Sequence, residues 1–278
     1  MPIILLIILL LTPFTVIGQT LTAHKGEVAN GYDYWLYTPD NSIAEETEPK
    51  PVIIFLHGAS LCGRNLEKVK RYGTIDAIEK GRKLDAYVIA PQNPGGSWNP
   101  VKVMNVLDYV SDYHNVDYDR VYVAGMSLGG FGTIDLAATY PDRIAAAMAI
   151  CGGGTVADLS PLAEVPLWIV HGTADRAVSI SQSDKVADKI KESDPDASRL
   201  AYDRVEGWTH GTPARLFYLP ETYEWLLSHT LKDPERNISD TFTLDNALLR
   251  TAYTGLRSMK VKGNKKRRTP KRAARLKK

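Results

Sequence analysis

The segment VYVAGMSLGG, residues 121–130, decides the fold. It passes from a short apolar run into a glycine-rich turn, and then into an apolar pattern with helical spacing over residues 128–140. The turn has the form Gly-x-Ser-x-Gly, with Ser127 at its centre. A serine between a buried strand and a helix takes strained backbone angles that expose its hydroxyl at the edge of a sheet. The segment therefore predicts a serine nucleophile on an α/β scaffold.

Short apolar runs alternate with helical patterns along most of the chain. The runs lie at residues 52–56, 87–90, 121–124, 145–150, 167–170 and 200–205, and the helical patterns at 65–80, 102–114, 128–140, 181–192 and 214–228. Nearly continuous apolar runs of this length are typical of strands covered on both faces. Their alternation with helices predicts an α/β fold with a mostly parallel central sheet flanked by helices. No insertion is long enough for a large lid domain, and no second core is visible.

A serine hydroxyl needs a base beside it and a third group that holds the base. On this scaffold the partners follow the serine in the order acid, then histidine. Asp175 comes just after the apolar run 167–170, and His210 comes after the last such run. The remaining histidines fit less well, because they follow strands directly, lie near helix ends or lie near the N-terminus: His57, His171, His114, His229 and His24. We predict Ser127, Asp175 and His210 as the catalytic residues.

Acyl transfer also needs N–H groups directed at the oxygen that becomes negative. The amide of Leu128, the residue after the nucleophile, is one expected donor. The second is expected from the loop after the first long strand, where Gly58 permits close backbone approach and Ala59 N–H follows.

Five segments carry a resemblance to a known family: LHGAS at residues 56–60, APQNPGGSW at 90–98, AGMSLGGFGT at 124–133, HGTADRAV at 171–178 and YEWLLSH at 223–229. Over residues 32–230 the chain resembles the α/β-hydrolase superfamily, and within it the secreted phospholipase/carboxylesterase and feruloyl-esterase-like serine esterases. The resemblance implies a nucleophilic Ser127, a base and then acid at His210, an orienting Asp175, oxyanion donors at Ala59 and Leu128, and neither a metal nor an organic cofactor. The chain departs from these relatives after the His57-Gly58 pair: they often show a second glycine and an acidic residue there, whereas Ser60, Leu61 and Cys62 follow in this chain.

The expected activity is hydrolysis of carboxylic esters through an acyl-enzyme on Ser127. The substrates expected are small-molecule or polysaccharide-linked esters of small acyl, acetyl or hydroxycinnamoyl groups. Trp98 and Trp208 lie in loops at the expected active edge and are candidates for stacking on substrate, the alternative being that they pack their loops. A serine peptidase of the same fold and a non-catalytic scaffold with a binding tail remain as alternatives.

The charge is distributed unevenly. Residues 260–278 hold 11 of the 34 Lys and Arg residues and no acidic residue, so residues 1–259 carry a net charge of −9. An acidic body offers no basic groove, and no nucleic-acid partner is expected. The basic tail, expected to be disordered, is either a solvated end or a contact for an anionic polymer or a membrane surface.

Residues 1–18 contain an apolar run over residues 3–11 and end in small residues before Gln19. The pattern favours a cleaved signal peptide and a secreted or periplasmic protein over an uncleaved anchor or a buried strand. The expected division is a catalytic domain over residues 19–230, a linker with a short amphipathic helix over 231–259, and the tail over 260–278. The sequence leaves open whether Cys62 and Cys151 form a disulfide or stay separate thiols.

Overall fold

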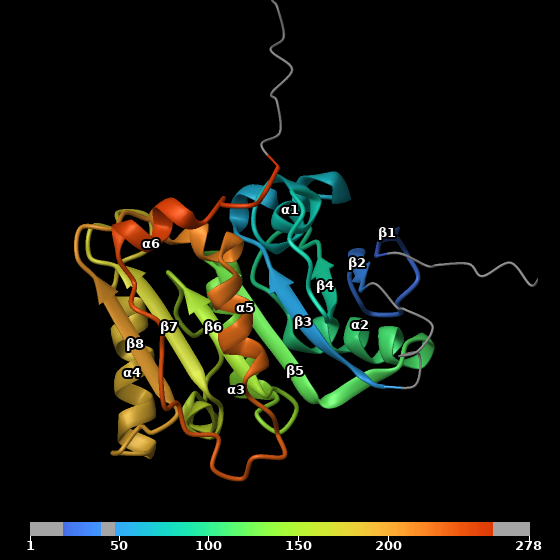
Figure 1. Ribbon diagram of the computed structural model, residues 1–278. Coiled ribbons are helices and arrows are strands. Elements are labelled where there is room, and N and C mark those ends of the chain that lie inside the picture. The colour runs from blue at the N-terminus through green and yellow to red at the C-terminus, as the bar shows by residue number, and fades with distance from the viewer. Residues whose placement is uncertain (1–18, 40–47, 258–278) are drawn as a thin grey trace, which may run out of the picture.

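The computed structural model describes residues 19–39 and 48–257. Eight strands form one sheet in the order β1-β2-β4-β3-β5-β6-β7-β8 (Figure 1). Their bounds are β1 Thr20–His24, β2 Tyr34–Thr38, β3 Lys50–Leu56, β4 Tyr87–Pro91, β5 Val116–Met126, β6 Ala146–Ile150, β7 Leu167–Gly172 and β8 Leu200–Val205. The two ladders that β2 makes, with β1 and β4, are antiparallel, and every other pair is parallel. The mostly parallel sheet predicted from the sequence is confirmed.

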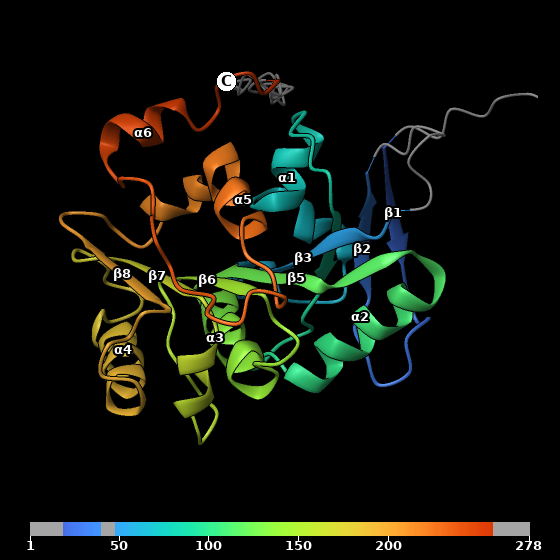
Figure 2. The same cartoon turned by 60° about the horizontal axis from the view of Figure 1, so that its bottom comes forward.

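Helices cover both faces of this sheet, as Figure 2 shows. One face carries α2 Pro100–Tyr113, α3 Leu128–Thr139 and α4 Ser181–Ser193; the other carries α1 Thr74–Glu79, α5 Pro220–Leu227 and α6 Asn246–Thr251. Short 3-10 helices complete the layers: η1 Ala59–Leu61, η2 Leu66–Arg71, η3 Ser160–Glu164 and η4 Thr212–Tyr218.

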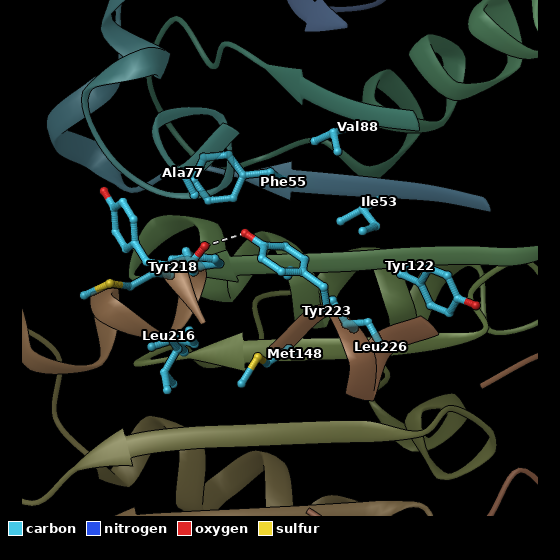
Figure 3. Close-up of a cluster of buried hydrophobic side chains, with 14 of the residues drawn as sticks. Ile53, Phe55, Ala77, Val88, Tyr122, Met148, Leu216, Tyr218, Tyr223 and Leu226 are labelled. Atoms are coloured by element: carbon cyan, nitrogen blue, oxygen red, sulfur yellow. Dashed lines mark hydrogen bonds between the residues drawn. The ribbon is translucent and has the colours of Figure 1, made fainter. Parts of the chain in front are cut away.

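The core has two halves because successive side chains of a strand point to opposite faces. On β3, Ile53 and Phe55 pack toward α1 and α5, whereas Ile54 and Leu56 pack toward α2 and α3. Figure 3 shows the first half, in which the hydroxyl of Tyr223 donates to the Phe217 carbonyl inside the apolar cluster. Burial of both faces explains why the strands appear in the sequence as continuous apolar runs.

Two helices expected as single elements are broken. The pattern over residues 65–80 forms η2 and α1, separated by Gly73 at a φ of 85°. A side chain at Gly73 would meet the ring of Phe55 at 2.1 Å, so packing onto the sheet requires glycine there. The pattern over residues 214–228 forms η4 and α5, and Pro220 begins the second because its fixed φ suits a first helical position.

The predicted linker after residue 230 is instead packed against the sheet. Phe242 contacts the indole of Trp168 at a ring-centroid distance of 4.7 Å, and the amide of Ile238 donates to the Ser198 carbonyl at 2.9 Å. Within α6, Leu249 is buried in the same apolar cluster as α1 and α5. Apolar side chains at helical spacing predicted this helix, which docks on the body. Residues 231–257 therefore belong to the same packed unit as the sheet.

The expected signal peptide at residues 1–18 and basic tail at 260–278 lie outside the described residues, and they remain predictions. Among the residues that are described, every helix is too short or too polar to cross a membrane.

Candidate active site

Ser127 lies at the tight turn between β5 and α3. Its φ of 59° and ψ of −123° are strained for a non-glycine residue, at a cost of roughly 1–3 kcal/mol. Close packing holds the turn: Ser127 N–H donates to the Ile150 carbonyl at 2.9 Å, and a side chain on Gly129 would lie 1.8 Å from the carbonyl oxygen of Leu56. The strained strand-to-helix turn expected from the sequence is present.

Asp175 and His210 meet from the ends of β7 and β8. The Asp175 side chain is fully buried, and its Oδ2 accepts a hydrogen bond from His210 Nδ1 at 2.7 Å. Its Oδ1 accepts the backbone N–H groups of Ala177 at 2.8 Å and Val178 at 2.9 Å. Burial acts to raise the pKa of Asp175, but the hydrogen bonds from Val178, His210 and Ala177 hold that pKa below its usual value. The charged carboxylate keeps a proton on Nδ1 of His210 and leaves Nε2 as the basic nitrogen.

β6 joins the two parts of the site. The Ser127 amide is bonded to Ile150, and the next residue, Cys151, has its Sγ 4.0 Å from the His210 carbonyl oxygen. Strands β5, β6, β7 and β8 lie side by side in Figure 1, so their carboxyl ends bring Ser127, Asp175 and His210 to one edge. One ligand atom each from Cys151, Asp175 and His210 lies within 4.8 Å of the others. The Asp175–His210 hydrogen bond explains this proximity, and we assign no metal to it.

The two expected oxyanion donors lie on adjoining elements. Leu128 is the first residue of α3 and Ala59 the first residue of η1. The amide at a first helical position has no acceptor within its own helix. The loop after β3 touches the turn directly, because a Cβ built on Gly58 would lie 3.4 Å from Cβ of Ser127. The role of Ala59 and Leu128 as oxyanion donors remains a prediction.

His57 holds this loop from within the core. Its Nδ1 donates to the Gly58 carbonyl at 2.8 Å, and its Nε2 accepts the Asn93 amide at 3.1 Å. Burial lowers the pKa of His57 to about 4; the Gly58 hydrogen bond opposes that shift, and the charge of Lys68 adds to it. His57 is therefore a neutral positioning residue, which agrees with its rejection as the catalytic base.

The free energy of unfolding is expected to fall between pH 6.5 and about 4 through His57. In this range the unfolded chain binds a proton at His57 that the folded chain does not, so stability is lost as the pH falls. The shift corresponds to about 3 kcal/mol. Urea unfolding of wild type and His57→Gln at several pH values measures it, and the gap between the two should narrow toward pH 4. Parallel profiles would contradict the assignment.

A cavity of about 480 Å³ opens beside His210. Its lining comes from the loops after β7 and β8: Ala174, Arg176, Ala177, Thr209, His210 and Gly211. The side chain of His210 is 28% exposed, and the residue forms part of the cavity lining. The volume lies in the range typical of small-molecule sites.

Comparison with curated proteins identifies esterases. The chain is 42% identical over 150 residues to acetylxylan esterase A of Emericella nidulans, covering 46% of this chain and 44% of that protein. It is 27% identical over 173 residues to a bifunctional acetylxylan esterase/xylanase of Neocallimastix patriciarum, covering 59% and 24% of the two chains. The chain spans 24% to 54% of the lengths of the first three relatives it matches. No family model matches it.

Comparison with solved structures identifies the fold. A thermostable esterase superposes with a TM-score of 0.61 at 24% identity, over 77% of this chain and 64% of that chain. The feruloyl esterase module of Clostridium thermocellum superposes with a TM-score of 0.55 at 13% identity, over 82% and 91%. This protein has the α/β-hydrolase fold. An acylaminoacyl peptidase shares it, with a TM-score of 0.53 at 15% identity over 84% and 43% of the two chains.

Trp98 and Trp208 are buried, so the expectation that they stack on substrate is wrong. Trp98 is 4% exposed, and its Nε1 donates to the His57 carbonyl at 3.2 Å. Trp208 is 3% exposed, and its Nε1 donates to Oδ1 of Asn246 at 3.1 Å. Both indoles pack the loops that carry the site, which was the alternative interpretation.

Sequence reasoning missed two neighbours of Asp175 and His210. Cys151 follows β6 directly, a position that could have placed it near Asp175 and His210, and both it and Cys62 are free thiols. His171, at the end of β7, has Nε2 3.3 Å from Oδ2 of Asp175 and Nδ1 2.8 Å from the Ser183 hydroxyl. The position of His171 at the end of a strand, four residues before Asp175, could have identified it as a neighbour of that carboxylate.

Proposed function

We propose that this protein is a secreted serine esterase that hydrolyses carboxylic esters through an acyl-enzyme on Ser127. The observation that carries the proposal is the 2.7 Å hydrogen bond between His210 and a buried Asp175, at the sheet edge where Ser127 occupies a strained turn. The relatedness to esterases supports ester hydrolysis as the reaction. Secretion rests on the apolar pattern before Gln19.

In the proposed reaction His210 takes the proton of the Ser127 hydroxyl as Oγ attacks the ester carbonyl. His210 then gives that proton to the departing alcohol, and the acyl group stays on Ser127. Water activated by His210 releases the acid and restores the serine. The buried carboxylate of Asp175 stabilises the imidazolium that forms in each half of the reaction.

The proposed substrates are esters of small acyl, acetyl or hydroxycinnamoyl groups, free or attached to polysaccharide. Two observations support this class. The cavity beside His210 is lined by short loops, and the segment between Asp175 and His210 consists of α4, β8 and their connections, with no lid inserted there. The names of the relatives, acetylxylan and feruloyl esterases, point to the same class.

Turnover of a substrate panel tests the proposal. We expect kcat/KM for p-nitrophenyl acetate, methyl ferulate and acetylated xylan to exceed that for peptide p-nitroanilides by about 10²-fold or more, because the loops of the site suit small acyl groups. The control is Ser127→Ala, which should remove turnover of every substrate. Faster cleavage of the anilides would favour the peptidase alternative, and equal rates in both proteins would contradict serine catalysis.

A further inference from the structure

Tyr72 lies outside every motif of the sequence, between η2 and α1, yet its hydroxyl reaches the loop beside Ser127. The Gly58 N–H donates to Tyr72 Oη at 3.0 Å. The ring is half-buried and packs against the core, so its position is fixed. The Tyr72 hydroxyl is thereby held against the loop that follows β3, next to Gly58.

The space around Gly58 locates the hydroxyl relative to the nucleophile. A Cβ built on Gly58 would lie 2.8 Å from Tyr72 Oη, 3.4 Å from Cβ of Ser127 and 3.3 Å from the Met126 carbonyl oxygen. One methyl group would thus touch both the phenol and the serine. Tyr72 Oη and Cβ of Ser127 therefore both border the small space beside Gly58.

The hydroxyl proton of Tyr72 is available for a ligand. The Gly58 amide occupies one lone pair of the oxygen and leaves the O–H to donate. Among the described residues, the other hydrogen-bond partner of this oxygen is Ser60 Oγ at 3.4 Å, which is long for an O–H···O bond. The hydrogen bond from the Gly58 amide polarises the phenol, which makes the O–H of Tyr72 a stronger donor.

We propose that Tyr72 is a third oxyanion donor, beside the amides of Ala59 and Leu128. This rests on the esterase function proposed above. As Ser127 Oγ bonds to the carbonyl carbon, the π pair of the C=O bond moves onto its oxygen, and the Tyr72 O–H donates to that oxygen while keeping its proton. When the pair returns, the bond to the alcohol oxygen breaks, and His210 supplies the proton that the alcohol needs. Tyr72 is then a catalytic residue.

Tyr72→Phe removes the hydroxyl and keeps the ring. We expect kcat on p-nitrophenyl acetate to fall by about 10²-fold, as for other single oxyanion donors, with KM changed by less than about threefold. The affinity for a trifluoromethyl ketone, which forms an oxyanion on Ser127, should fall by a similar factor. Tyr113→Phe is the matched control, because it removes a phenol hydroxyl from a side chain that is 70% exposed on α2. It should leave both quantities unchanged.

Two results would overturn the proposal for Tyr72. One is a kcat of Tyr72→Phe within about threefold of wild type. The other is a lowered kcat with unchanged affinity for the trifluoromethyl ketone, since Tyr72 would then act only by holding the Gly58 turn. A failure of the proposed function would give a different result: wild type and Ser127→Ala would then turn over the substrate at equal rates, with Tyr72 left unchanged in both proteins.

Discussion

Asp175→Asn is expected to lower kcat by about 10⁴-fold at neutral pH while the fold is retained. The carboxylate accepts two backbone amides on Oδ1 and His210 Nδ1 on Oδ2. An asparagine has a single side-chain oxygen, which the amides of Ala177 and Val178 would hold. Its NH₂ group would then face His210 and donate to Nδ1, which forces the proton onto Nε2. An imidazole in that tautomer cannot accept the proton of Ser127.

The measurement is kcat on p-nitrophenyl acetate, with the thermal unfolding temperature recorded to show that the variant folds. Asp108→Asn is the matched control, because Asp108 forms a surface ion pair with Arg143 at 2.6 Å. A surface pair of this kind contributes little, so activity should stay within about twofold of wild type. Activity of Asp175→Asn within about tenfold of wild type would exclude the carboxylate as the group that orients His210.

The parts of the fold that follow from local pattern were predictable. Strands such as β3 and β7 are buried on both faces and therefore appear as continuous apolar runs, and the Gly-x-Ser-x-Gly segment places a strained turn between β5 and α3. The placement of Asp175 and His210 after successive strands also required only the order of elements. Their hydrogen bond agrees with that placement.

The parts that depend on distant contacts were not predictable. At Gly73, where the helical pattern is broken at a φ of 85°, the Phe55 ring occupies the space that a side chain would need. Trp208 is buried, and its Nε1 donates to Asn246 of the C-terminal segment. Tyr72 belongs to no periodic pattern, and its approach to Gly58 follows from how η2 and α1 pack on the sheet. The spacing of residues along the sequence does not indicate contacts between such distant residues.

Ser127→Ala is expected to have the largest effect of all, a fall in kcat of about 10⁶-fold. The methyl group cannot form the acyl-enzyme, and what remains is the stabilisation of a direct attack by water. The turn itself should survive, because its backbone is held by the Ile150 carbonyl and by the contact of Gly129 with Leu56, neither of which involves the hydroxyl. An unchanged unfolding temperature would show that the loss is chemical.

The most direct test is mass spectrometry of the protein after reaction with diethyl p-nitrophenyl phosphate, which leaves a stable phosphoryl group on an activated serine. The esterase mechanism predicts one diethylphosphoryl group per chain, located by peptide mapping at Ser127, and none on Ser127→Ala. A label at another residue, or equal labelling of the two proteins, would contradict Ser127 as the nucleophile.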